Sequence, residues 1–141
     1  MRVMVLVKAN KESEAGVMPP AELFVAMGKY NEELVKAGIL LAADGLHPSS
    51  KGVRVHFSGT SRTVTDGPFA EAKELVAGFW LWEVRSMEEA IEWVRRCPNP
   101  HVGESDIEIR PIFSAEDFAA IVPPEVAQME AKLREQTGGK A

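Results

Sequence analysis

The sequence predicts an α+β fold of the ferredoxin-like type, in which two helices cover one face of an antiparallel sheet. The predicted elements follow the order β, α, β, hairpin, β, α, β, which is the split βαβ pattern with an added hairpin. The chain has 141 residues, the size of one domain, and 45% of them are apolar, so a core can be buried. Several predicted strands also carry apolar side chains on their second face, which predicts a homodimer that covers this face.

The first strand and the first helix are indicated by their apolar patterns. Residues 3–7 are apolar and rich in valine, as in a buried strand, and a polar loop is expected over 10–16. A helix is predicted over 21–37, because its apolar residues recur at helical spacing. Pro20 favours its first turn and Gly38 its end.

The middle of the chain reads as strands separated by turns. A short apolar strand is expected over 39–43 and ends in a loop. Residues 52–57 alternate apolar and polar side chains, and with 62–65 they predict a hairpin. The strongest strand pattern covers 75–84.

The second half of the fold begins with a helix-start signal. Ser86 and Glu89 match a capping box, and Pro98 ends the helix after about Arg96. A last strand is predicted over 106–110. We therefore assign residues 1–113 to the ferredoxin-like domain and 114–141 to a C-terminal helical extension, with a helix over 124–136 and a frayed end from 138.

Composition excludes several classes of function. The net charge is −5 and no basic cluster is present, so nucleic-acid binding is not expected. The apolar runs are shorter than the roughly 18 residues of a membrane span, and no signal peptide is seen, so we expect a cytoplasmic protein. The single cysteine, Cys97, and the scattered histidines give no metal motif, and no dinucleotide or phosphate-binding loop occurs. We expect neither a metal nor a cofactor.

The densest chemical signal is the run from Val64 to Glu74, which sets charged and hydroxyl side chains around a Gly67–Pro68 corner. Asp66 is a candidate catalytic carboxylate, which the corner would hold at a pocket mouth near Asp44 and His47. The alternative is a turn in which Asp66 caps its own backbone. Thr65 and Glu71 are candidate ligand-binding residues, and Glu71 can equally be a solvated charge.

Other candidates for acid–base catalysis are Glu22, Asp44 and His47. Each has a structural alternative: Glu22 in the first turn of a helix interacts with the helix dipole, Asp44 ends a strand, and His47 lies exposed in a loop. Arg54 can hold an anionic group, and Trp80 can stack on a ligand or pack in the core or dimer interface.

Several ordered motifs resemble the YCII-related, DGPF-type family, whose biochemical activity is largely unassigned. The motifs are Pro20-Ala21-Glu22-Leu23, Tyr30-Asn31-Glu32-Glu33-Leu34, Asp44-Gly45-Leu46-His47-Pro48, Thr65 to Glu74, and Gly78-Phe79-Trp80. The resemblance implies a ferredoxin-like fold paired as a dimeric α/β barrel. Smaller members carry a histidine near the start of the first helix and an aspartate after the second strand, as a proposed acid–base pair. The matching positions here are Glu22 and Asp44, so a carboxyl replaces the histidine, and one carboxyl of such a pair needs a raised pKa.

The predicted function is cofactor-free acid–base catalysis on a small organic molecule in a pocket of a homodimer. The alternative is a non-catalytic module that binds a small ligand or a protein. Family members are often encoded beside, or fused to, extracytoplasmic-function sigma factors, so the resemblance makes a regulatory partner conceivable.

Overall fold

The computed structural model of the chain describes residues 1–138 and divides into two compact units, Met1–Pro111 and the segment from Ile112 onward. The predicted boundary lies two residues later, after 113. The frayed end expected from 138 lies, for 139–141, outside the described residues.

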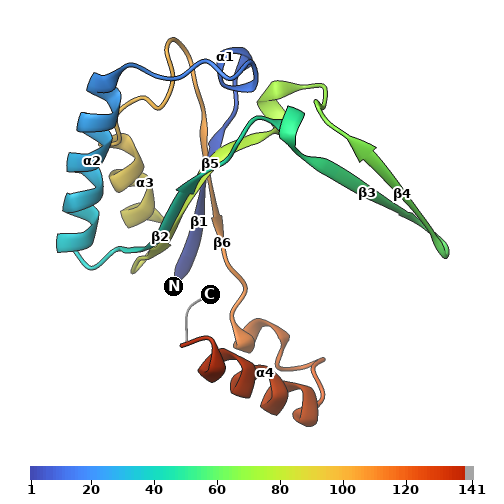
Figure 1. Cartoon of the computed structure of the whole chain (residues 1–141). Coiled ribbons are helices and arrows are strands. Elements are labelled where there is room, and N and C mark those ends of the chain that lie inside the picture. The colour runs from blue at the N-terminus through green and yellow to red at the C-terminus, as the bar shows by residue number, and fades with distance from the viewer. Residues whose placement is uncertain (139–141) are drawn as a thin grey trace. The chain divides into compact units, whose positions relative to one another are not determined.

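The first unit is built on a four-stranded antiparallel sheet (Figure 1). Its strands are β1 (Arg2–Lys8), β2 (Leu40–Gly45), β5 (Val76–Glu83) and β6 (Ile107–Pro111), in the order β2-β5-β1-β6. The first and third of these strands in the chain, β1 and β5, lie in the centre, and the second and fourth, β2 and β6, lie at the edges. This order is that of the split βαβ fold, so the predicted α+β fold class is confirmed.

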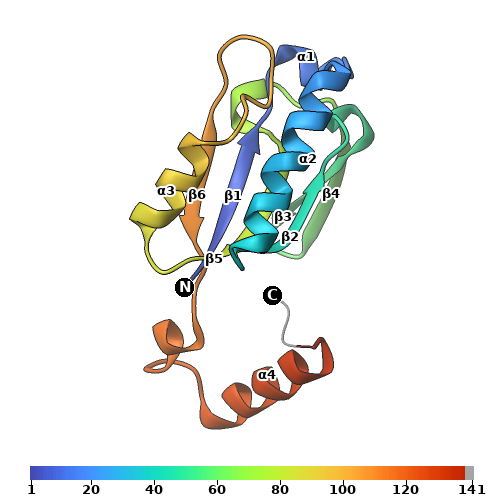
Figure 2. The same cartoon turned by 90° about the vertical axis from the view of Figure 1, so that its left-hand side faces the viewer.

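Helices α2 (Ala21–Lys36) and α3 (Met87–Arg95) lie side by side over one face of the sheet (Figure 2). Gly38 follows the end of α2 with φ of 74°, the left-handed conformation that glycine adopts without cost. The Ser86 hydroxyl accepts the Glu89 N–H at 3.1 Å, as predicted. The Glu89 carboxylate accepts the N–H of Arg85, one residue before the cap. Its hydrogen bond with the Arg85 guanidinium lowers the pKa of Glu89.

The core lies between the helices and the sheet. Alternate residues of the central strands face α2 and α3, because side chains of a strand point to opposite faces in turn. Val3 and Trp82 are paired across β1 and β5, as are Val5 and Trp80, and all four are 5% exposed or less. Leu34 of α2 packs against them and is fully buried.

Within the unit of residues 1–111, no helix covers the opposite face of the sheet. The register puts Met4, Leu6, Phe79 and Leu81 on this open face, which is therefore apolar at its centre. Glu108 and Arg110 of β6 continue it toward one edge. An apolar surface of this kind favours a second layer of protein.

The predicted hairpin forms a separate two-stranded sheet of β3 (Val53–Ser58) and β4 (Ser61–Asp66). One of its faces carries Val55, Phe57 and Val64, which are 46–66% exposed. Short 3₁₀ turns η1 (Ser49–Lys51) and η2 (Ala72–Glu74) flank the hairpin.

The loop expected over 10–16 contains a short helix, α1 (Lys11–Glu14). Asn10 and Ser13 form a reciprocal capping box there, with the Ser13 N–H donating to Asn10 Oδ1 at 2.8 Å. A single turn buries no apolar stripe, so no helical period marked it in the sequence.

The second unit contains a 3₁₀ turn, η3 (Ala115–Phe118), and helix α4 (Pro124–Gln136). The rings of Phe113 and Phe118 pack with centroids 4.6 Å apart. Ser114 caps η3 through Asp117. Across residues 1–138, none of the helices has the length and apolar character needed to cross a bilayer.

Candidate functional site

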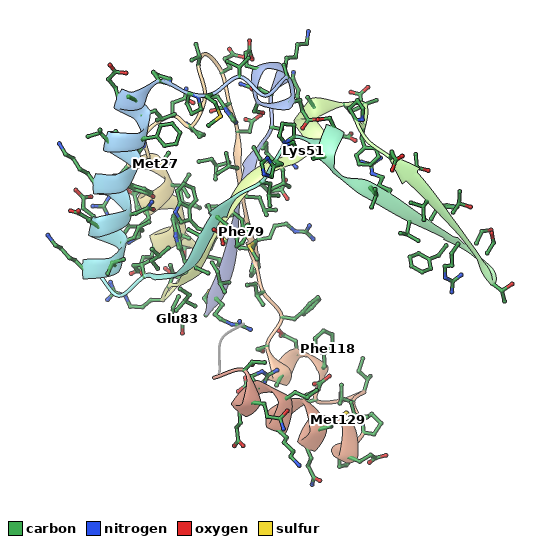
Figure 3. The ribbon with its side chains drawn as sticks, viewed as in Figure 1. Met27, Lys51, Phe79, Glu83, Phe118 and Met129 are labelled. Carbon is green, nitrogen blue, oxygen red and sulfur yellow. The ribbon has the colours of Figure 1, made fainter. Side chains whose placement is uncertain are left out.

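A large open cleft lies between helix α2 and the sheet. Its volume is about 1020 Å³, at the upper end of the usual range for small-molecule sites. The lining comes from α1 and the segment after it, α2, the end of β2, the loop with η1, β5 and the loop before β6. Figure 3 shows Met27, one of the lining residues, on the side of α2 that faces the sheet.

The floor of the cleft owes its depth to two paired glycines. Gly45 at the end of β2 lies opposite Gly78 of β5. The register puts Gly78 on the same face as Trp80, so a side chain here would project toward the helices. A Cβ on Gly78 would lie 3.1 Å from the Asp44 carbonyl oxygen, which leaves little space. The absence of both side chains leaves room for a ligand next to Trp80.

The helix wall is apolar except for one amide. Leu23, Phe24 and Met27 line the cleft from α2, and Asn31 follows one turn after Met27. The Trp80 indole N–H donates to Asn31 Oδ1 at 2.8 Å across the cleft floor. Trp80 is 5% exposed, so it serves the core as well as the lining.

The rim on the β2 side is held by a hydrogen-bond network around Ser49. The Glu14 carboxylate accepts both the Ser49 N–H, at 2.9 Å, and the Ser49 hydroxyl. The Ser49 Oγ in turn accepts the Phe69 N–H at 3.0 Å. This network ties α1 and the Gly67–Pro68 corner to the loop that carries His47, an exposed residue of the cleft lining.

The corner packs by close backbone contact. The Gly67 N–H donates to the Gly52 carbonyl oxygen at 2.9 Å. A Cβ on Gly67 would lie 1.7 Å from the Ser49 carbonyl oxygen, so only glycine fits. The Arg54 guanidinium lies 3.8 Å from the centroid of the Phe69 ring, which fastens the corner to β3.

The predicted site residues fall into two groups. Asp44, His47 and Trp80 line the cleft. The cleft lining does not include Glu22, Arg54, Thr65, Asp66 or Glu71, and all five are exposed. The register puts the Asp44 side chain beside Phe79 on the open face, so the cleft reaches round the end of the edge strand β2.

The residues outside the cleft have distinct settings. Asp66 lies opposite Val53 at the end of the hairpin, while Thr65 and Arg54 are paired on its other face. The Asp66 carboxylate does not cap the following turn through Phe69, because that N–H donates to Ser49. Glu71 precedes η2 with φ of 63°. A role of these residues toward a ligand stays a prediction.

The sequence reading missed His101, which lies in the loop before β6 and lines the cleft. Its Nε2 lies 2.8 Å from the Lys8 carbonyl oxygen. A carbonyl only accepts, so Nε2 carries the proton, and in the neutral ring Nδ1 is left as the basic nitrogen. The Asn99 side chain holds the loop by accepting the His101 N–H at 3.0 Å. Asn99, two residues before His101, was the one local signal of an ordered loop.

Asn31, Glu14 and Ser49 were also missed as site residues. Asn31 had a usable signal, because it is a polar residue one turn beyond the apolar Met27. Glu14 and Ser49 had none, since their contact joins segments 35 residues apart. Within residues 1–138, no three or more histidine, cysteine, aspartate or glutamate side chains are grouped so that they could hold a metal ion.

The sheet order, the helix pair and the cleft define a ferredoxin-like α+β protein with a site the size of a small molecule. The chain belongs to the YCII-related family, because the model of the YCII-related domain matches residues 1–116. It is 33% identical over 103 residues to an uncharacterized protein of Rhizobium meliloti (strain 1021), across 73% of this chain and 78% of the relative.

Among solved structures, the chain is similar to 5-chloro-2-hydroxyhydroquinone dehydrochlorinase (TftG) from Burkholderia phenoliruptrix AC1100, in complex with 2,5-dihydroxybenzoquinone. The TM-score is 0.47 and the identity 17%, with 83% of this chain and 98% of that chain covered.

Proposed function

We propose that the chain binds a small organic molecule in the cleft and catalyses a cofactor-free proton transfer on it. The observation that carries this proposal is that His47, His101 and Asp44 all line one cleft whose walls are largely apolar. Apolar walls bind an organic body, and a few polar groups orient it. Imidazoles are the side chains best suited to move protons near neutral pH.

The two histidines differ in how they are held. His101 donates from Nε2 to the Lys8 carbonyl, which fixes the orientation of the ring. His47 is exposed on a loop held by the Glu14–Ser49 hydrogen bonds. In this proposal, one of the two imidazoles accepts a proton from the ligand and the other donates a proton at a second position of the same ligand.

We further propose that the protein works as a homodimer formed through the open sheet face. The apolar centre of this face, with Leu6 and Phe79, supports the proposal. A partner there would also cover the Asp44 end of the cleft, because Asp44 lies beside Phe79 on that face.

The second candidate is a non-catalytic binding module, and the exposed apolar face of the β3–β4 hairpin supports it. Its partner would be of the regulatory kind that the sigma-factor association of the family suggests. In this reading, the cleft binds a ligand without changing it.

Deuterium exchange distinguishes the two candidates. Small ketones and keto acids are incubated with the protein in D₂O, and deuterium incorporation next to the carbonyl is followed by proton NMR. We expect exchange above the buffer rate for at least one compound, with a loss of tenfold or more in both His47→Asn and His101→Asn.

The matched control is His56→Asn, because His56 lies on the hairpin outside the cleft lining. Exchange that is equally reduced in His56→Asn would contradict catalysis in the cleft. Binding of compounds with no exchange above buffer would support the binding module.

A further inference from the structure

Asn31 has a fixed orientation. The indole N–H of Trp80 is only a donor, so the atom facing it at 2.8 Å must be the amide oxygen of Asn31. The Asn31 amide is therefore not free to turn over, and its NH₂ group points away from the indole. Because Trp80 is 5% exposed and lies on β5, which is paired with both β1 and β2, the indole that sets this orientation is itself fixed.

The NH₂ group of Asn31 has unused donors. Among residues 1–138, no protein group accepts a hydrogen bond from Asn31 Nδ2, although the side chain is half-buried. Within residues 1–138, only Trp82 Nε1 is both buried and without a partner, so solvent in the cleft reaches Asn31 Nδ2. Asn31 lines the cleft, so the partner can come from a molecule within it.

The surroundings make this donor selective. The neighbouring wall is built from Met27, Phe24 and Leu23, and the floor from Gly78 and Ala43. In such a cleft, a single oriented amide would determine which end of an apolar ligand lies beside Asn31. A donor in an apolar setting also discriminates strongly against ligands without an acceptor.

We propose that Asn31 is a ligand-binding residue whose NH₂ group donates to an acceptor oxygen, of a carbonyl or a carboxylate, on an otherwise apolar small molecule. The proposal rests on the proposed function only in requiring that the cleft takes a small organic molecule. It adds the chemical class of that molecule and the residue that recognises it.

The test uses three probes with the same ring system: indane, 1-indanone and indane-1-carboxylate. Their dissociation constants are measured by NMR titration of ¹⁵N-labelled protein, with the Trp80 indole signal as the reporter. We expect 1-indanone or indane-1-carboxylate to bind about five- to tenfold more tightly than indane, and the better of the two tells a carbonyl from a carboxylate site.

Asn31→Asp keeps an oxygen for the Trp80 indole and removes the donors. We expect the preference for the oxygenated probe to disappear while indane binding stays within twofold. Asn31→Leu loses both the oxygen and the donors and adds no charge. It should lose the preference for the oxygenated probe in the same way, which would show that the loss in Asn31→Asp does not come from its negative charge. The control is Lys29→Gln, which makes the same change in net charge on α2 outside the cleft lining and should keep the preference.

The outcomes separate the inference from the proposed function. Equal binding of all three probes to the wild-type chain, or a preference that survives in Asn31→Asp, overturns the role of Asn31 and leaves the cleft as a binding site. If no probe shifts any cleft signal at the solubility limit, both proposals fail.

Discussion

Gly67 and Ser49 touch so closely that a Cβ on Gly67 would lie 1.7 Å from the Ser49 carbonyl oxygen. The contact is backbone against backbone, and it cannot be relieved by turning a side chain. The Gly67–Pro68 corner and the His47 loop therefore form one packed unit.

Replacing Gly67 by alanine should destabilise the fold by about 1–3 kcal/mol, because the corner must move away from Ser49. Urea unfolding followed by circular dichroism measures the change. The control is Gly28→Ala in α2, where a Cβ meets no atom within 4 Å. That change should instead stabilise the chain by about 0.5–1 kcal/mol, since alanine is the better helix former. Equal effects of the two variants would contradict the packing argument.

Asp66→Asn tests the predicted catalytic carboxylate. If Asp66 acts on a ligand, the change should lower probe binding or exchange tenfold or more, while the free energy of unfolding changes by less than about 1 kcal/mol. Both quantities are measured on the same preparation, beside His47→Asn. Unchanged binding would leave Asp66, which lies outside the cleft lining, without a role toward the ligand.

Stability should fall on the alkaline side. Burial raises the pKa of the Tyr30 hydroxyl, which donates to the Trp93 carbonyl oxygen at 2.5 Å. Burial also raises the pKa of the Cys97 thiol to about 12. In the unfolded chain these groups lose protons at about pH 10 and about pH 8.5. Their contribution is therefore fully present below those values and is lost as the pH rises further.

Unfolding free energies from pH 8 to pH 11 measure this loss. Each group contributes a slope of up to about 1.4 kcal/mol per pH unit between its two pKa values. Tyr30→Phe and Cys97→Ala should each flatten part of the decline. If neither variant changes the slope, groups other than Tyr30 and Cys97 cause the loss of stability at alkaline pH.

The homodimer is tested by sedimentation equilibrium at micromolar concentration. We expect about twice the chain mass of 15.4 kDa. Leu6→Glu, in the middle of the open face, should give a monomer, because the interface would bury an unpaired charge. Val25→Glu makes the same kind of change at an exposed position of α2 and should leave the mass unchanged. A monomeric wild-type chain would rule out the proposed dimer.

Most of the fold was predictable because its signals are local. The caps and stops of α2 and α3 lie within one or two turns of the residues that they control, as with Gly38 and Ser86. The unbroken apolar run over 3–7 predicted β1 in the same way, although only the structure shows that Val3, Val5 and Val7 form its buried face. Helix α1 was missed because its only signal is the pair Asn10 and Ser13.

The site was less predictable because its parts meet only through tertiary contacts. His101 gains its partner from Lys8, 93 residues away, and Trp80 gains Asn31 from 49 residues away. Gly67 was correctly seen as special, but its reason is the approach of Ser49 rather than a positive φ, and no local pattern reveals that approach.

The Trp80–Trp82 pair gives the protein an optical signature. The two indoles lie 5.9 Å apart with their planes at 42°, close enough for their excited states to couple and to produce a circular-dichroism couplet. Among residues 1–138, the buried Trp82 indole N–H has no hydrogen-bond partner, and such a dry environment shifts emission to shorter wavelengths. Trp80 borders the cleft, so an occupant would change the surroundings of one member of the coupled pair, whereas Trp82 lies in the core. A change in the couplet would thus report occupancy of the cleft, and its loss would report unfolding of the core, without any added dye.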